Sequence, residues 1–276
     1  SIVNHTRMAG AMVALGALIG LAQIPHARGQ APAPAPAAAP TNLVEHSYEH
    51  RFQLDLRVPD AALAKFLPAG WEPNIAAQGP AKDTNVRLIF IDRFDITGAN
   101  GQPKGKGYNR LAHLAVPIKQ TGGTAVGQMI IGGISDDPND ATAPAGVYTQ
   151  ASVSKMQRSF TSTGGAATGE ENWEFQAASG ERFEVHVKYE VAPAVRNPNP
   201  ADARFFSVKD PASFVLVRSD QGLDIMQNVP VPVPGNRVKE FTLKAGGGKF
   251  AALFDGTEKV MSWDALPWLV RTISTP

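Results

Sequence analysis

Residues 108–133 read YNRLAHLAVPIKQTGGTAVGQMIIGG, and they are the most informative segment of the chain for its architecture. The segment holds two apolar runs of strand length. Gln120–Thr124 separates them and contains the pair Gly122 and Gly123, which suits a tight turn. The pattern therefore predicts a β-hairpin.

A third run, residues 146–160, reads GVYTQASVSKMQRSF. It carries Lys155 directly after small residues, Ala151 to Ser154, where a lysine side chain could be enclosed instead of solvated. If the protein carries out covalent chemistry, we expect it on the walls formed by these three runs.

Composition excludes several classes of function. The chain has 276 residues and a formal net charge of +1, which gives no electrostatic basis for nucleic-acid binding. It has no cysteine, so disulfides, thiol catalysis and cysteine-based metal sites are excluded.

Residues 1–29 are predicted to be a secretory signal peptide. Arg7 precedes an apolar run, Met8–Ala22, and Ala27 and Gly29 are small residues at the two positions that a signal peptidase reads. The alternative is a membrane anchor, but a spanning helix needs about 20 apolar residues. We therefore expect export to the periplasm or the extracellular space, with a mature form that does not span the membrane.

The chain after the signal peptide divides into a linker and one domain. Residues 30–43 are rich in alanine and proline, and alternating prolines block both helix and sheet pairing. Residues 44–276 are predicted to form a single β-rich domain, because short apolar runs and turn residues recur throughout.

Strand patterns dominate the predicted domain. Ser47–Val58 alternates, with Phe52 and Leu54 on one face and Arg51 and Gln53 on the other, which predicts a half-buried strand. In total we expect ten to twelve strands and one or two short helices. This count favours a mainly antiparallel barrel-like or sandwich domain.

Three further segments complete the local predictions. Thr161–Gly169, rich in serine, threonine and glycine, is expected to be a flexible loop, and Lys249–Phe254 a strand. Trp263–Ile273 could be a short helix or a strand.

Residues 52–74, 85–98 and 107–133, in that order, resemble the first half of the acetoacetate decarboxylase family. The first segment contains Asp60 and Leu63 followed by a Leu-Pro pair, and the third contains a tyrosine, Tyr108, followed by a Val-Pro strand and a glycine turn. The resemblance implies a mainly β (α+β) fold, an antiparallel barrel or cone-like domain with one or two short helices.

In that family, a lysine forms a Schiff base with a β-keto acid, after desolvation and a neighbouring cation have lowered its pKa. The resemblance implies Lys155 as the catalytic nucleophile, and we expect Arg110, Tyr108 and Tyr148 to be substrate-binding residues. It implies no cofactor and no metal. The expected partner is a small carboxylate or keto acid, and homo-oligomer formation is left open.

The sequence also departs from the family pattern. Arg110 stands where the family has an acid two positions after the tyrosine, Ile89 stands where a second carboxylate is expected, and Lys155 lacks the Pro-Lys-Lys setting. A structural or envelope-associated domain with no ligand is a weaker alternative. Two functions that involve a ligand therefore stay open: an exported Schiff-base lyase or decarboxylase, and a non-enzymatic periplasmic ligand-binding protein that has lost the catalytic groups. In both, Arg110 beside an enclosed Lys155 would form a positive pocket for a carboxylate.

A zinc-peptidase-like pattern, His46-x-x-Glu49-His50, has the wrong local structure for metal binding. It runs into an alternating strand, in which residues four apart are separated by about 13 Å at 3.3 Å per residue. The two histidines could share a metal only on a helix, so zinc catalysis is not expected.

Overall fold

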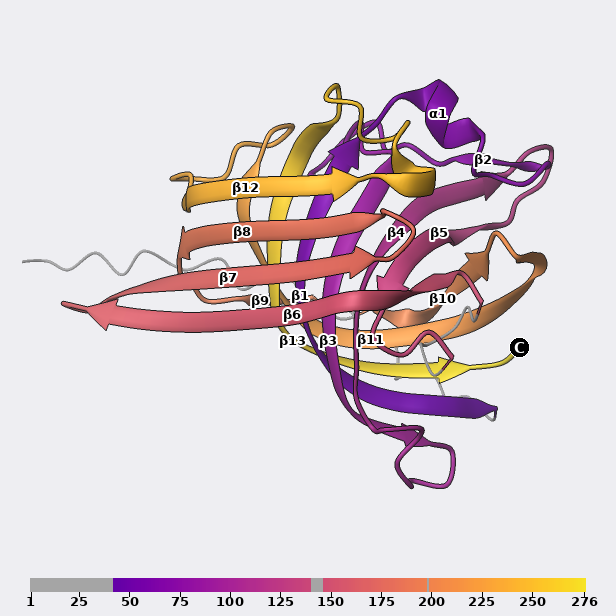
Figure 1. Cartoon of the computed structure of the whole chain (residues 1–276), viewed down its shortest axis with the longest axis horizontal. Coiled ribbons are helices and arrows are strands. Elements are labelled where there is room, and N and C mark those ends of the chain that lie inside the picture. The colour runs from indigo at the N-terminus through magenta and orange to yellow at the C-terminus, as the bar shows by residue number, and fades with distance from the viewer. Residues whose placement is uncertain (1–41, 140–145, 198) are drawn as a thin grey trace, which may run out of the picture. The chain divides into compact units, whose positions relative to one another are not determined.

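The computed structural model of the chain describes residues 42–139, 146–197 and 199–276 (Figure 1). The predicted signal peptide and nearly all of the predicted linker lie outside these residues. No helix within them is long and apolar enough to cross a membrane. The elements are β1 (Leu43–Arg57), α1 (Asp60–Ala64), β2 (Trp71–Pro73), β3 (Val86–Gly98), β4 (Asn109–Gln120), β5 (Val126–Ser135), β6 (Tyr148–Thr163), β7 (Ala166–Ala177), β8 (Arg182–Glu190), β9 (Val195–Arg196), β10 (Asn199–Ser207), β11 (Asp210–Asn228), β12 (Val238–Gly246), the 3₁₀ helix η1 (Gly248–Phe250) and β13 (Lys259–Ser274).

Seven strands close into a barrel, in the order β5-β10-β11-β13-β1-β3-β4 and back to β5. Neighbours in this ring are antiparallel, except that β5 and β10 are parallel. β1 lies between β13 and β3 and pairs with both along most of its length. This arrangement confirms the predicted mainly β, barrel-like fold with one or two short helices, and it confirms the hairpin of residues 108–133.

Four further strands form an extension of the sheet, in the order β6-β7-β8-β12 (Figure 1). It continues from β5 through a short parallel pairing of Gly133 with Tyr148. Its inner face packs against the outside of the barrel, where Trp173 and Phe175 of β7 lie 6.0 and 6.3 Å from Phe90 of β3, measured between ring centroids. The outward faces of β1, β3 and β4 are therefore covered by an apolar core.

The inward face of β1 is polar although it is buried. Phe52, Leu54 and Leu56 point into the apolar core, and the residues between them point into the barrel. Glu49 has 1% of its surface exposed and Asp55 has 2%. Such burial of charge is tolerated only where the charges are paired, so the barrel interior requires partners for these acids.

Two of the predicted local structures were wrong. Most of Thr161–Gly169 is not a loop, because β6 and β7 continue through it to a tight turn at Gly164 and Gly165, whose φ angles are 60° and 87°. Lys249–Phe254 is not a strand but holds the end of η1 and the turns after it. Trp263–Ile273 lies within β13, so of its two alternatives the strand is correct.

Candidate functional site

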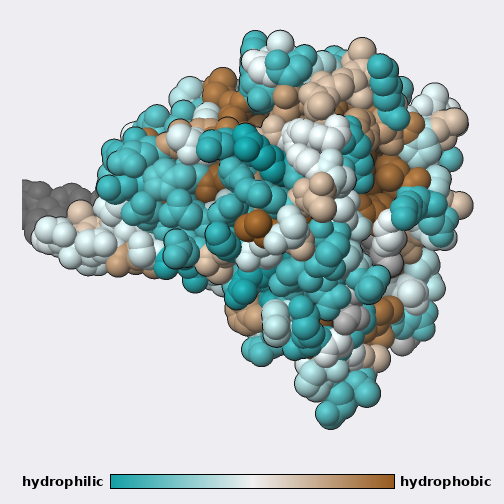
Figure 2. Space-filling view, in the orientation of Figure 1, coloured by the Kyte–Doolittle hydropathy of each residue, from teal (hydrophilic) through white to brown (hydrophobic). Residues whose placement is uncertain are grey.

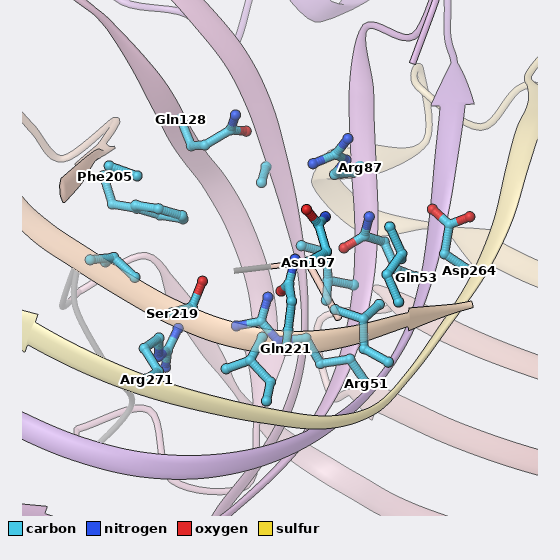
Figure 3. Close-up of a pocket in the computed structure, with 17 residues that line it drawn as sticks. Arg51, Gln53, Arg87, Gln128, Asn197, Phe205, Ser219, Gln221, Asp264 and Arg271 are labelled. Carbon is cyan, nitrogen blue, oxygen red and sulfur yellow. The ribbon is translucent and has the colours of Figure 1, made fainter. Parts of the chain in front are cut away.

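A cavity of about 240 Å³ lies within the barrel (Figure 3). All seven barrel strands contribute to its walls. Its polar lining residues are Arg51, Gln53, Arg87, Gln128, Asn197, Ser219, Gln221, Asp264 and Arg271, and its apolar ones are Ile89, Ala115, Ala203, Phe205, Val217, Leu223, Leu266 and Leu269.

Two of the three arginines in the cavity wall share one buried acid. Arg51 Nε donates to Glu49 Oε2 at 2.5 Å, and Arg271 Nη2 lies 2.7 Å from Glu49 Oε1. Burial raises the pKa of Glu49, but Arg271, Arg51 and Arg93 outweigh that effect and hold the pKa at about 2. Glu49 is therefore ionised at neutral pH and orients both guanidinium groups.

The third arginine, Arg87, comes from β3. Its Nε and Nη2 donate to the two oxygens of Asp55 at 2.7 and 3.4 Å. Its side chain keeps 34% of its surface accessible, whereas that of Asp55 keeps 3%. Asp55 thus fixes one edge of the guanidinium, and the accessible part of the side chain belongs to the cavity wall (Figure 3).

Several neutral polar side chains of the cavity have no partner among the residues that the structure describes. Within the described part of the chain, the side chains of Gln53, Gln128, Ser219 and Gln221 make no hydrogen bond. Gln53 is the clearest case, because only 7% of its surface is exposed and it lines the cavity. Buried amides are almost always hydrogen-bonded, so these groups are available to a ligand or to water in the cavity.

Asp264 on β13 is the only acid in the cavity wall among the described residues. It is 5% exposed, and its Oδ1 accepts a hydrogen bond from Ser262 Oγ at 2.7 Å. Burial raises its pKa to about 7, with a further contribution from the neighbouring Asp55. The site therefore combines permanent cations with one carboxyl group that titrates near neutral pH.

A second buried polar group lies in the barrel interior, around Tyr148. The Tyr148 hydroxyl and Nδ1 of His113 form a hydrogen bond of 3.1 Å. Burial lowers the pKa of His113 to about 3, so its ring is neutral, and burial raises the pKa of Tyr148 to about 12. The other ring nitrogen of His113, Nε2, has no partner in the described structure.

Comparison with solved structures identifies the fold. The enduracididine biosynthesis enzyme MppR complexed with pyruvate matches with 18% identity over 86% of this chain and 90% of that chain, with a TM-score of 0.52. The same enzyme with HEPES buffer bound matches with 15% identity over 85% and 86%, with a TM-score of 0.51. These alignments cover most of both chains, and the observed barrel is the one that the sequence resemblance implies. The chain has the acetoacetate decarboxylase-like fold.

An acetoacetate decarboxylase-like enzyme from Sphingomonas wittichii RW1 also matches, with 13% identity over 85% of this chain and 93% of that chain and a TM-score of 0.45. No protein-family model matches the sequence. No curated protein matches it either. At these identities the comparisons establish the acetoacetate decarboxylase-like fold and leave the activity to be argued from the site.

The expectation that Lys155 is enclosed was wrong. Its side chain is 69% exposed, and its Nζ lies 3.6 Å from Glu174 on β7. β6 pairs with β5 only over Tyr148–Gln150 and then runs along β7, so Lys155 lies on the outer face of the extension. That face is mainly hydrophilic (Figure 2).

The expected position of Arg110 beside Lys155 was also wrong. Arg110 Nε donates to Asp92 at 2.9 Å across the β3–β4 pair, and its side chain is 42% exposed. Alternation along β4 turns the neighbouring Leu111 and the residues at 113 and 115 inward, which directs Arg110 outward. Tyr108 precedes β4 and is 47% exposed, with Lys106 Nζ 4.9 Å from its ring centroid.

Of the predicted site residues, Tyr148 alone is in the barrel interior, but it does not line the cavity. Sequence reasoning missed the arginines, glutamines and Asp264. A signal was present in β1 and β3, where Arg51, Gln53 and Arg87 alternate with apolar residues, among them Phe52, Leu54 and Leu88 of the core. The described residues contain no group of three or more side chains arranged to hold a metal ion.

Proposed function

We propose that this protein binds a small carboxylate, in particular an oxo acid, in the barrel cavity. The observation that supports this most strongly is that three arginines line a cavity in which the side-chain amides of Gln53, Gln128 and Gln221 have no partner among the described residues. Arginine presents a planar set of donors that matches a carboxylate, and the side-chain amides supply donors and acceptors for a second oxygen.

The size of the cavity favours a ligand of a few carbon atoms. Its volume of about 240 Å³ lies below the range of roughly 300–1,000 Å³ that is usual for larger ligands. The apolar side chains of Ile89, Leu266 and Val217 suit a short alkyl chain next to the charged group. A structure of MppR, which shares the fold, is described as complexed with pyruvate, an acid of this class.

The cavity does not favour Schiff-base chemistry. Every lysine of the sequence falls within the described residues, and none of them lines the cavity. An imine with the ligand needs a neutral amine within bonding distance of the ligand carbonyl, and guanidinium groups stay protonated at neutral pH. The cavity therefore gives no support to the Schiff-base enzyme, the first of the two functions that the sequence leaves open. It favours a protein that binds its ligand without a lysine.

Export remains part of the proposal. The predicted signal peptide would place the domain in the periplasm or outside the cell, where small carboxylates derived from the surroundings would be the available ligands.

Calorimetry tests the proposal, with acetate, pyruvate, 2-oxobutyrate and acetoacetate as ligands. We expect an oxo acid to bind more tightly than acetate. Ser219 on β11 pairs with Arg271 on β13, so Ser219→Leu places an isobutyl group in the cavity next to that arginine. This variant should reduce the affinity for the oxo acid at least tenfold. Arg87→Gln should have a similar effect, because it removes a cation from the wall.

Lys155→Ala is the matched control, since its exposed side chain is outside the cavity, and it should bind like the wild type. Circular dichroism would show that each variant is folded. The absence of binding for all four acids, or unchanged affinity in both cavity variants, would overturn the proposal.

A further inference from the structure

Asp264 differs from the other acids of the barrel interior in its partners. Asp55 is held by Arg87 and Glu49 by Arg51 and Arg271. In the described structure, by contrast, Asp264 accepts one hydrogen bond, from the neutral hydroxyl of Ser262. An acid that lines a cavity without an ion pair is able to exchange a proton with whatever the cavity holds.

Three other strands supply the charged and polar groups around Asp264. On β1, Gln53 is the register partner of Asp264, and Asp55 of the same strand raises the pKa of Asp264. Arg87 on β3 lowers that pKa, and Asp224 on β11 raises it. Asp224 is itself paired with Arg237. Burial and the nearby acids favour the protonated form, whereas Arg87 and the Ser262 hydroxyl favour the ionised form, and the resulting pKa is about 7. Both forms are therefore populated at neutral pH, which is the condition for efficient acid–base catalysis.

We propose that Asp264 is a catalytic acid–base residue that removes a proton from the carbon next to the carbonyl of a 2-oxo acid bound in the cavity. This inference rests on the proposed function, since it requires that the arginines hold the carboxylate of the acid. The substrate class follows from the chemistry: a carbon-bound proton next to a carbonyl is acidic enough for a carboxylate base when the developing enolate is stabilised.

The step balances without any further reagent. A carboxylate oxygen of Asp264 forms an O–H bond as the C3–H bond of the acid breaks. The electron pair of that bond forms the C2=C3 double bond, and the carbonyl electron pair moves onto the C2 oxygen, which becomes an enolate. The donors available to that oxygen are the guanidinium of Arg87 and the free amide of Gln53. Return of a proton from Asp264 to C3 regenerates the oxo acid.

Deuterium exchange detects this step. In D₂O, protonated Asp264 exchanges its hydrogen with solvent, so deuterium is incorporated at C3. With 2-oxobutyrate as the probe, we expect the wild-type protein to accelerate the loss of the C3 methylene signal in the proton NMR spectrum. Asp264→Asn should reduce the protein-dependent rate by at least about 100-fold, the usual contribution of a catalytic base. Calorimetry on the same sample should show affinity within a few-fold of the wild type.

Two further variants distinguish catalysis from a structural role. Ser262→Ala removes the hydroxyl that favours ionised Asp264, so the pH at which the exchange rate reaches half its maximum should increase. Lys155→Ala should exchange at the wild-type rate, which excludes catalysis by that exposed amine.

The outcomes separate this inference from the proposed function. Binding of 2-oxobutyrate without accelerated exchange, or exchange that persists in Asp264→Asn, overturns the role of Asp264 and leaves the binding proposal standing. Absence of binding by the wild type overturns both. Exchange that rises through about pH 7 in the wild type and is lost in Asp264→Asn, with binding retained, supports the inference.

Discussion

Replacing Asp264 by asparagine is expected to stabilise the folded protein above neutral pH and to leave its stability unchanged near pH 4. Burial and the neighbouring Asp55 raise the pKa of Asp264 from 3.8 to about 7. Between these two values, the folded protein holds a proton that the unfolded chain has lost. Unfolding then releases a proton, so the free energy of unfolding falls as the pH rises.

The size of the effect follows from the pKa shift. A rise of about three pKa units corresponds to roughly 4 kcal/mol at 1.36 kcal/mol per unit, and relaxation around the cavity would reduce it to about 2–4 kcal/mol. Asparagine keeps the shape of the side chain and an oxygen for the Ser262 hydroxyl but carries no charge. The stabilisation should therefore be near zero at pH 4, increase from there to pH 7 and stay constant above it.

Urea unfolding, followed by tryptophan fluorescence, measures this effect. Wild type and variant are compared at pH 4, 6 and 8, so that the contributions of the titratable groups that both proteins share cancel in the difference between their free energies of unfolding. Asp55→Asn is the matched control: it removes the partner of Arg87 and should destabilise the protein at pH 8. If Asp264→Asn is no more stable than the wild type at pH 8, or is stabilised equally at pH 4, the pKa of Asp264 is not raised and the reasoning fails.

Three other predictions concern the barrel, the lysine and the amino terminus. Arg93→Met should lower the free energy of unfolding by about 1.5–3 kcal/mol, because it removes one buried cation from Glu45 and Glu49, which keep Lys104, Arg51 and Arg271 as partners. Arg110→Ala, whose ion pair is exposed, should cost less than about 1 kcal/mol in the same urea experiment. Borohydride reduction in the presence of acetoacetate should leave the mass of the protein unchanged, and a reduced adduct mapped to Lys155 would instead restore the Schiff-base prediction. Expression of the full chain in a bacterial host should yield a product that begins near Gln30, and an uncleaved product would contradict the predicted signal peptide.

The local elements of the fold were predictable because their signals are local. The hairpin of β4 and β5 follows from two apolar runs and a glycine turn, and the hairpin of β7 and β8 follows in the same way from alternation on both sides of Gly180. The order of the strands supported the fold family. The polar residues at 161–163 misled the prediction because the tip of the β6–β7 hairpin is exposed, so its strands carry no apolar pattern.

The site was not predictable in the same way. Alternation shows which residues share a face of a strand, but it does not show whether that face lies against solvent or inside the barrel. Arg51, Gln53 and Asp55 would fit a solvent-facing strand equally well. Only closure of the barrel, through the pairing of β11 with both β10 and β13, turns that face inward. Lys155 was misplaced for the converse reason: its small neighbours suggested enclosure, but the strand leaves the barrel after Gln150 and follows β7.

The kind of cation in the cavity limits the chemistry that this barrel can support. A lysine in a desolvated site loses its proton readily and becomes a nucleophile, whereas a guanidinium delocalises its charge and keeps its proton. The cations at positions 51, 87 and 271 can therefore bind and polarise an oxo acid, but they cannot attack it. Asp264 is the only acid in the described cavity wall, and for this reason the reaction that we propose is proton transfer next to the carbonyl. Gln128 on β5 lines the same cavity, so Gln128→Lys should allow an oxo acid to form an imine that borohydride traps, which the wild type should not do. If borohydride traps no imine in this variant, the arginines do not place the carbonyl near β5.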